Sequence, residues 1–474
     1  MLSLVKFIQS KPIRMSALAY GLLTTLVLLG SFDAQALPLF ARQTGQNCLA
    51  CHAGGQFPEL TPYGRMFKMT GYTIGTRTEA PISVMGEITA ASVANTSKDP
   101  NPEQTFAKNG APMFEGGSVF IGGKITDNIG AFTQITYNNY SGQAIGVSGN
   151  NDGRWQGQSA ADNMDIRYAD RLIDPGRDLV FGVSLNNDPS VSDPWNTAAA
   201  WMQYVPTPGM AAQFADSTTP YPNNAAGANV AGLTAYMFLN QSIYGELGFY
   251  RTANQVFSFM SAGTNDASTT HLQGANNPYW RLAYSHEWGA QNIMVGTSGM
   301  IAHVFDGSTD PSDSGAYQRV KSVGIDTQYQ YLLDPHTVTV QAAYQRQTTD
   351  LSPNAIATAV AGGPPFTLFD DTLDVFRAKA TYVYKAKYGG SVSFFNLSGP
   401  TNIASPAQTT GNASGNPATR GFTYEAFWLP IQNIRVGAQY TMYSKFNGAS
   451  DNYDGFGRNA RDNNTLLLYV WGAY

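Results

Sequence analysis

Over most of its length the sequence consists of short segments in which apolar and polar residues alternate. In the segment 372–385, one parity is apolar, with Phe376 and Tyr384, and the other is polar, with Arg377 and Lys379. Because successive side chains of a β-strand point to opposite faces, this pattern predicts strands with one apolar face. Strands of a soluble sandwich alternate in the same way, so the pattern alone does not place them in a membrane.

The connections between the segments are alternately short and long. We expect sixteen strands, at residues 82–94, 115–125, 129–140, 163–173, 177–186, 229–238, 241–252, 280–288, 290–303, 318–332, 336–348, 372–386, 388–398, 419–429, 433–446 and 463–474. The predicted tight turns are Thr126-Asp127-Asn128, Asp174-Pro175-Gly176, Asp334-Pro335, Gly389-Gly390 and Leu429-Pro430. Short turns at one end, long loops at the other and an even strand number are typical of antiparallel outer-membrane β-barrels, whose short turns face the periplasm. A two-domain soluble β-protein is the alternative.

The composition favours an all-β protein. After residue 36, no run approaches the roughly 18 consecutive apolar residues of a membrane-spanning helix. Charged residues make up 13% of the chain, aromatic residues make up 12%, and glycine occurs 48 times, which favours ordered β-structure over disorder. The net charge of −5 gives no reason to expect a nucleic-acid partner.

The N-terminal residues have the pattern of an export signal. Three basic residues precede an apolar run from Ala17 to Leu29, and Ala34-Gln35-Ala36 follows as an A-x-A cleavage site. The run is shorter than the ~20 residues that span a bilayer, which argues against an uncleaved membrane anchor. The sequence therefore predicts a signal peptide over residues 1–36 and a mature chain beginning at Leu37.

The only two cysteines of the chain lie in Cys48-Leu49-Ala50-Cys51-His52. The spacing C-x-x-C-H predicts covalent attachment of one haem c, with His52 as an axial iron ligand. A disulfide or half of a zinc site is the alternative, but no second cysteine pair could complete a four-ligand zinc site. We therefore expect a monohaem cytochrome c segment at residues 37–80, followed by a porin-like barrel at residues 81–474.

A segment as short as 37–80 buries too little apolar surface to stand alone around a haem. A barrel of sixteen strands encloses a wide lumen. We therefore expect the haem segment to plug the lumen at its periplasmic mouth. Unusually long loops are often functional, so the connection 187–229 is predicted to fold into the lumen as well.

The haem segment resembles a known family. The matching residues are Phe40-Ala41-Arg42-Gln43-Thr44-Gly45, the C-x-x-C-H motif and Phe57-Pro58-Glu59-Leu60-Thr61-Pro62-Tyr63-Gly64-Arg65-Met66-Phe67-Lys68. They are similar to the fused monohaem cytochrome–porins of the outer membrane, best known as iron oxidases of iron-oxidising bacteria. The resemblance implies a haem-bearing barrel that oxidises Fe(II). It is less specific for the electron donor than for the architecture.

Two methionines near the motif are candidates for the second axial ligand of the haem iron. Met66 and Met69 are close enough in sequence to reach back over a haem, although methionines in a tight plug often only pack. Other ligands, water or an open site are the alternatives. His286 shares a face with apolar residues and is predicted at a lipid interface, and His336 beside a turn is predicted to be structural.

Charged residues offer two further candidate roles. Arg42, Arg65 and Lys68 are candidates to pair with haem propionates, or else are solvated at the periplasmic mouth. Three aspartates, Asp306, Asp310 and Asp313, follow His303 in a predicted extracellular loop. Oxygen ligands with an imidazole could hold Fe(II) briefly, but a solvated acidic loop is the simpler interpretation.

These features predict an electron conduit in the outer membrane. Its single haem c would oxidise extracellular Fe(II), or another extracellular donor, and pass electrons to a periplasmic c-type cytochrome. Two alternatives remain open. One is a porin or transport protein that the haem segment merely plugs, and the other is a structural or sensory protein whose haem binds a gas. Outer-membrane lipid is the expected surrounding of the barrel.

Overall fold

The computed structural model describes residues 38–55, 59–78, 81–98, 109–145, 151–197, 229–262, 272–307, 310–361, 370–401 and 412–474. The predicted signal peptide and cleavage site lie outside the described residues. None of the described helices combines the length and hydropathy needed to cross a bilayer.

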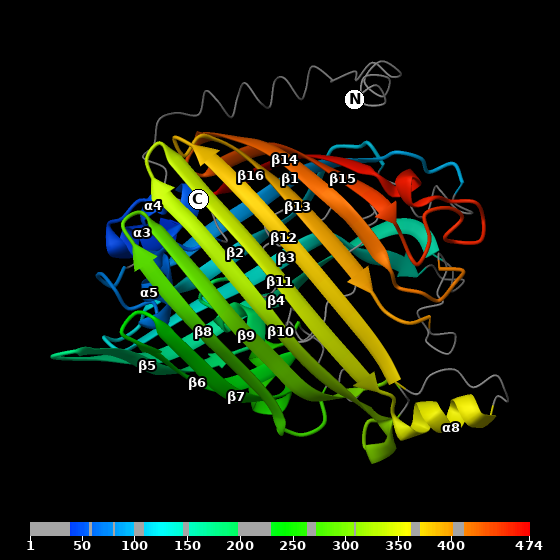
Figure 1. Cartoon of the computed structure of the whole chain (residues 1–474), viewed down its shortest axis with the longest axis horizontal. Helices are drawn as coiled ribbons and strands as arrows, with labels where there is room; N and C mark the ends of the chain where they lie inside the picture. Colours follow the sequence, from blue (N-terminus) through cyan, green and yellow to red (C-terminus); the bar gives the residue numbers. More distant parts are fainter. Residues whose placement is uncertain are drawn as a thin grey trace. The chain divides into compact units, whose positions relative to one another are not determined.

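Sixteen antiparallel strands form one closed barrel, in which each strand pairs with its neighbours in sequence and β1 pairs with β16 (Figure 1). The strands are β1 (Ile82–Val93), β2 (Met113–Lys124), β3 (Ile129–Ile145), β4 (Asn151–Asp174), β5 (Arg177–Asn186), β6 (Val230–Leu239), β7 (Ile243–Thr252), β8 (Asn277–Trp288), β9 (Gln291–Phe305), β10 (Tyr317–Leu333), β11 (His336–Asp350), β12 (Asp370–Tyr384), β13 (Tyr388–Ser398), β14 (Thr419–Ile431), β15 (Ile434–Lys445) and β16 (Thr465–Ala473). The predicted fold class of a sixteen-stranded antiparallel barrel is confirmed.

The barrel closes through its first and last strands. Met85 pairs with Ala473 and Thr89 pairs with Tyr469. At the end of this seam, the amide of Tyr474 donates to the carbonyl oxygen of Val84 at 2.8 Å. Closure leaves the sheet without a free edge, so the backbone groups of every strand find partners on both sides.

The alternation in the sequence separates the two faces of the wall. In β12, Phe376 and Tyr382 have 37% and 45% of their surface exposed, whereas Arg377 and Lys379 between them are 4% exposed. The apolar parity therefore faces outward and the polar parity faces inward. This polarity is the reverse of a soluble barrel with an apolar interior and is that of a transmembrane barrel.

Two of the predicted turns were wrong. Gly389 lies within β13, and the turn before it is formed by Lys385 and Ala386, which adopt positive φ values of 53° and 50°. A Cβ at Gly389 would come within 2.2 Å of the ring of Phe427, its partner on β14. Glycine is therefore needed here to leave room for that ring. Pro430 lies within β14, where a register shift accommodates the missing amide hydrogen. Strands β3 and β4 also extend further than predicted, with β4 beginning at residue 151 instead of 163.

The N-terminal segment is helical. Its elements are α3 (Pro38–Thr44), α4 (Cys48–Cys51), the 3₁₀ turn η1 (Ala53–Gly55) and α5 (Pro62–Met69), blue in Figure 1. The Asn47 side chain caps α4 by accepting from the amide of Ala50 at 3.2 Å. The Thr61 hydroxyl caps α5 by accepting from the amide of Gly64 at 3.1 Å, and Pro62 occupies the first turn, where its missing amide hydrogen costs nothing.

The remaining short elements lie in the connections between strands. They are α7 (Pro189–Ser192), η4 (Gln255–Met260), η6 (Ser314–Ala316), α8 (Pro353–Ala361) and η8 (Ala460–Asn463). Each of them lies in a long connection, at the end of the barrel opposite the short turns. The predicted alternation of short turns and long loops is therefore confirmed.

Candidate functional site

The two cysteines occupy the ends of the single-turn helix α4. Residues three apart on a helix share a face, so both thiols are presented on the same side of the turn. They are not joined by a disulfide. Cys48 is buried, and its thiol lies 3.5 Å from Oε1 of Gln432, in the turn between β14 and β15. The motif therefore lies against the short-turn end of the barrel wall.

His52 follows immediately at the C-terminal end of α4. Its amide donates to the carbonyl oxygen of Cys48 at 2.8 Å, and its backbone forms an isolated bridge with Leu60. Desolvation lowers the pKa of His52 to about 4, so the imidazole is neutral at neutral pH. Burial, with a smaller contribution from Cys48, raises the pKa of Cys51 to about 11. Neutral imidazole is the form that binds a metal.

Helix α5 packs directly on α4 through a glycine. A Cβ at Gly64 would lie 2.2 Å from the carbonyl oxygen of Cys51, so no larger residue fits without moving the backbone. Thr61 fixes the same contact, because its hydroxyl donates to the carbonyl oxygen of Ala50 at 2.5 Å and its amide donates to that of Cys51 at 2.9 Å. The stretch Thr61-Pro62-Tyr63-Gly64 thereby determines the geometry of the motif.

A buried ion pair joins the motif region to the wall. Nζ of Lys379, an inward-facing residue of β12, lies 3.2 Å from Oε1 of Glu59. Glu59 is 6% exposed and Lys379 is 4% exposed. Gly54 lies against the same strand, because a Cβ added at this glycine would be 2.7 Å from Cγ2 of Val383. Removing one partner of a buried pair leaves an uncompensated charge, which makes the arrangement specific.

Arg65 of α5 is buried against a nearby part of the wall, formed by β9 and β10. Its guanidinium donates to the carbonyl oxygen of Leu60 at 2.9 Å and to three side-chain oxygens of β9 and β10, from Gln328 at 3.3 Å, Gln330 at 3.1 Å and Asn292 at 3.1 Å. Burial lowers the pKa of Arg65 to about 10, so the side chain remains charged at neutral pH. These donors are directed at the wall rather than at an open space.

Lys68 joins α5 to the long connection after β5. Its ammonium group donates to the carbonyl oxygen of Asp193 at 2.8 Å, and burial lowers the pKa of Lys68 to about 8. The carboxylate of Asp193 lies 3.0 Å from Arg281 of β8, which also pairs with Asp326 of β10 at 2.7 Å. The predicted inward folding of this connection is thus confirmed for residues 187–197, and the rest of it lies outside the described residues.

A further network of buried charged side chains was not predicted from the sequence. The Tyr72 hydroxyl donates to Oδ2 of Asp165 at 2.6 Å, and the same oxygen accepts from Nε of Arg167 at 2.7 Å. Asp165 and Arg167 lie on the inward parity of β4 and are both fully buried. Their position in the alternation along β4 was the one sequence feature that could have indicated this network, because charged residues in the wall of a membrane barrel face the interior.

The structure places both candidate methionines against one aromatic cluster. Met69 is 1% exposed and packs with aromatic residues that include Trp195 and Tyr244. The Tyr236 hydroxyl donates to its carbonyl oxygen at 2.7 Å. Met66 is partly buried and packs against the same cluster. Sulfur packed against aromatic rings is a favourable contact in itself, and an axial role for either methionine stays a prediction.

Two other histidines have side chains on the outer face of the wall, on the side away from the motif. His286 is exposed on the outer face and stacks on Trp288 at 5.5 Å, as predicted for a lipid interface. Nδ1 of His336 lies 2.8 Å from the hydroxyl of Tyr382, also on the outer face. The backbone amide of His303 donates to Oδ1 of Asn277, and this contact assigns no role to the imidazole. His271 lies outside the described residues.

The acidic loop has the geometry of ordinary turns. Asp310 accepts from Ser312, and Asp313 accepts from Gly315 and Asn354, while Asp306 accepts from Ser352. Among the described residues, no group of three His, Cys, Asp or Glu side chains is arranged to hold a metal ion. The suggestion of a transient Fe(II) site in this loop therefore gains no geometric support.

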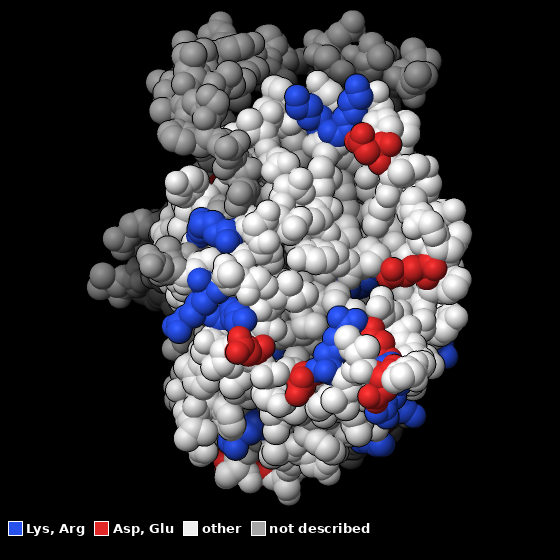
Figure 2. All heavy atoms as spheres, turned by 90° about the vertical axis from the view of Figure 1, so that its left-hand side faces the viewer, with Lys and Arg blue, Asp and Glu red and all other residues white. Residues whose placement is uncertain are grey.

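The outer face carries exposed aromatic residues near the short turns. Trp288, Tyr384 and Tyr388 border short turns, Trp428 lies three residues from the end of β14, and all four have between 36% and 55% of their surface exposed. Aromatic girdles at the two interfaces and an apolar band between them are typical of outer-membrane barrels. At the end of the molecule that carries the C-terminus, basic and acidic residues are interspersed over the surface (Figure 2).

The sequence matches no known family model and no curated protein. Its structure is similar to solved porins and channels at low identity, including the following three. OmpF of Salmonella typhi, in complex with daunomycin, is 11% identical, with 83% of this chain and 97% of that chain covered and a TM-score of 0.46. The channel DcaP of Acinetobacter baumannii is 8% identical, with coverage of 85% and 99% and a TM-score of 0.42. An anion-selective porin from Comamonas acidovorans is 9% identical, with coverage of 83% and 98% and a TM-score of 0.41.

Replacing Arg65 by methionine is expected to loosen the N-terminal segment from the barrel. Methionine keeps the aliphatic packing but leaves the amide oxygens of Gln328, Gln330 and Asn292 without their shared donor, which should cost about 3 kcal/mol. Hydrogen exchange of residues 62–72 in detergent measures the local opening free energy. Arg42→Met, a change at an exposed cation of the same segment, is the matched control and should cost less than about 1 kcal/mol. Equal effects of the two changes would contradict the proposed anchoring.

Proposed function

We propose that the protein is an outer-membrane electron conduit in which residues 38–78 plug the barrel and carry one haem c. Cys48 and Cys51 are the covalent anchors, and His52 is an axial ligand. The observation that carries the proposal is the position of the C-x-x-C-H turn, because the neighbouring residues Glu59 and Gly54 contact the inner wall of a closed barrel with an apolar outer face.

The donor set suits haem c. Two thiols lie on one face of α4, and a neutral imidazole follows directly. When bound, the haem would supply a reversible one-electron iron couple. The contact between Gly64 and the Cys51 carbonyl fixes the turn that presents both anchors.

Residues of the wall and of the long connection hold the segment in place. Lys379 binds Glu59, the oxygens of Gln328 and Gln330 bind Arg65, and the backbone of Asp193 binds Lys68. Each of these contacts replaces water with a protein partner inside the barrel. These contacts support a segment held inside the barrel, because inward-facing side chains of the wall bind its buried charged residues.

The proposed route of transfer crosses the outer membrane. An apolar band ~25 Å tall blocks ions and electrons alike unless a protein bridges it. We infer that extracellular Fe(II) is the donor and a periplasmic c-type cytochrome the acceptor. The choice of Fe(II) rests on the resemblance of the haem segment to the iron-oxidase cytochrome–porins, and another extracellular donor would use the same architecture. Oxidation outside the cell also keeps the insoluble ferric product out of the periplasm.

A plugged porin is the second candidate. Its supporting observation is the polar inner face of a sixteen-stranded barrel, on which charged residues such as Arg281 and Asp326 are gathered. In such a protein, the N-terminal segment would control the passage of small solutes. The haem would then contribute to the fold of the plug and not to electron transfer across the membrane.

Proteoliposomes with oxidised cytochrome c trapped inside distinguish the two functions. When Fe(II) is added outside the vesicles, the haem-loaded protein should reduce the trapped cytochrome. The Cys48→Ala/Cys51→Ala variant should reduce it no faster than empty vesicles do. Equal reduction by the wild type and the variant would mean that Fe(II) enters through the barrel, and it would favour the plugged porin over the conduit.

A further inference from the structure

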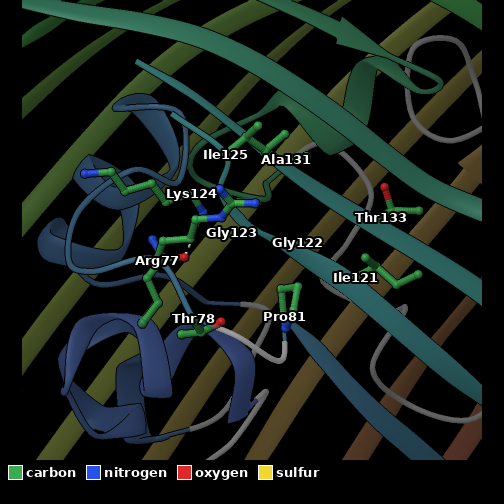
Figure 3. A pocket seen from close by; sticks show the side chains of 11 residues that line it. Arg77, Thr78, Pro81, Ile121, Gly122, Gly123, Lys124, Ile125, Ala131 and Thr133 are labelled. Carbon is green, nitrogen blue, oxygen red and sulfur yellow. Dashed lines mark hydrogen bonds between the residues drawn. The ribbon is translucent and has the colours of Figure 1, made fainter. Parts of the chain in front are cut away.

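A pocket of about 610 Å³ lies beside the N-terminal segment at the short-turn end of β2 and β3. It is lined by residues of three parts of the chain: Gln43 of α3, Arg77, Thr78 and Pro81 of the strap leading to β1, and the end of the β2–β3 hairpin. In Figure 3, Arg77 and Lys124 lie together at one side of the pocket, and Ile121 and Thr133 lie at the other side. None of the haem-motif residues lines it.

The pocket opens on the outer face of the wall. Ile121 is 41% exposed and pairs with Thr133, whereas the neighbouring Phe120 is 4% exposed and stacks on Phe132 inside the barrel. The side chains of Ile121 and Thr133 therefore point outward, because residues alternate between the two faces. Ile125, at the end of the hairpin, is 48% exposed. The floor of the pocket is thus an outward-facing, largely apolar surface.

The height of the pocket on the wall corresponds to the membrane interface. It lies at the hairpin turn between β2 and β3, one of the short turns that face the periplasm in a barrel of this type. Tyr168, which pairs with Ile129 beside the pocket, is 46% exposed on the outer face. An exposed tyrosine at a strand end is typical of the headgroup level of a bilayer.

One buried glutamine holds the two sides of the pocket together. The backbone carbonyl of Gln43 accepts from the amide of Thr76 at 2.9 Å, next to Arg77. Its side-chain Oε1 accepts from the amide of Lys124 at 2.9 Å. Gly123 makes this approach possible, because a Cβ there would lie 2.3 Å from Oε1 of Gln43 and its φ of +115° suits glycine. Gln43 therefore fixes the backbone at Lys124 and next to Arg77, and so holds the two cationic residues on either side of it.

The charges of the lining are all positive. Arg77 forms no ion pair with any residue that the structure describes. Lys124 pairs at 2.8 Å with Asp127, which is 89% exposed at the tip of the turn. An ion pair with an exposed carboxylate contributes little, so an anion of the membrane surface can replace it. The pocket therefore combines two cations at the headgroup level with an apolar surface that runs toward the hydrocarbon.

We propose that this pocket binds one anionic phospholipid of the periplasmic leaflet, with its phosphate at Arg77 and Lys124 and an acyl chain along Ile121 and Thr133. A basic side chain near an anionic membrane surface contributes about 1 kcal/mol, so the two cations select for anionic headgroups. Because Gln43 belongs to α3, the lipid fastens the strap and the N-terminal segment to the hairpin from outside. The site is independent of the haem and of the donor.

Native mass spectrometry of the full-length protein in detergent tests the site, with phosphatidylglycerol as the probe. The wild type should retain one tightly held lipid per chain. Arg77→Gln/Lys124→Gln should weaken retention about thirtyfold. The matched control is Arg171→Gln/Arg177→Gln, which removes two cations from the same rim, where they pair with Asp178 and Asp174. This control should retain the lipid as the wild type does.

A second pair of variants tests the acyl surface without changing charge. Ala131→Trp fills the floor of the pocket and should reduce retention, whereas Ile135→Trp, on the same outer face of β3 but beyond the pocket, should not. Equal retention in the cation double variant and its control would overturn the proposal. Displacement of the lipid by millimolar glycerol 3-phosphate would also overturn it, since the pocket would then be a site for a free anion.

Discussion

Cys48→Ala/Cys51→Ala is expected to remove all covalently bound haem while the barrel still assembles. The two thiols are the only ones in the chain, so no other side chain can form the thioether bonds. The strands owe their stability to wall contacts in which α4 takes little part, so folding should survive the change. A haem-peroxidase stain after denaturing electrophoresis should fall to background, and heat-modifiable migration should persist.

The control for this experiment is Met69→Leu. This substitution conserves volume within the cluster of Trp195 and Tyr244 and should cost less than about 1.5 kcal/mol. It leaves both anchors in place, so the stain should be retained. Haem staining that survives the double cysteine change would refute the attachment site, whatever the variant does to folding.

Much of the wall could be predicted from the sequence because its signal is local. The bounds of β5 and β13 agree with the predicted 177–186 and 388–398. A strand in a membrane barrel needs only alternating side chains and a turn at each end, and both can be recognised within a dozen residues. The wrong turns at Gly389 and Pro430 arose because glycine and proline also serve inside strands, for ring packing and at a bulge.

The interior could not be predicted in the same way, because its contacts join residues that are far apart in the sequence. Glu59 and Lys379 are separated by 320 positions, and Arg65 meets Gln328 across 263. Which inward residue meets which depends on barrel closure and on the orientation of α5. The sequence predicted that Arg65 and Lys68 would either pair with propionates or be solvated, and the structure instead binds both to the wall and the long connection.

The haem motif is an intermediate case. The residue types and spacing of Cys48, Cys51 and His52 indicate the chemistry without any structure. What the structure adds is the reason for the neighbouring residues, because Thr61 caps α5 and bonds to α4, and Gly64 permits their contact. These two residues belong to the stretch that carries the family resemblance, and their roles here are steric and backbone-directed.

The most direct test of the account is stopped-flow mixing of the oxidised, haem-loaded protein with Fe(II), monitored through the haem absorption bands. We expect prompt reduction in the wild type and loss of that reduction in His52→Ala, whose covalent anchors remain. The His286→Ala protein, which loses a histidine exposed on the outer face, is the matched control and should react as the wild type does. A wild-type haem that stays oxidised in Fe(II) but is reduced by another extracellular donor would contradict iron oxidation. Unchanged Fe(II)-oxidising activity in His52→Ala would contradict the conduit itself.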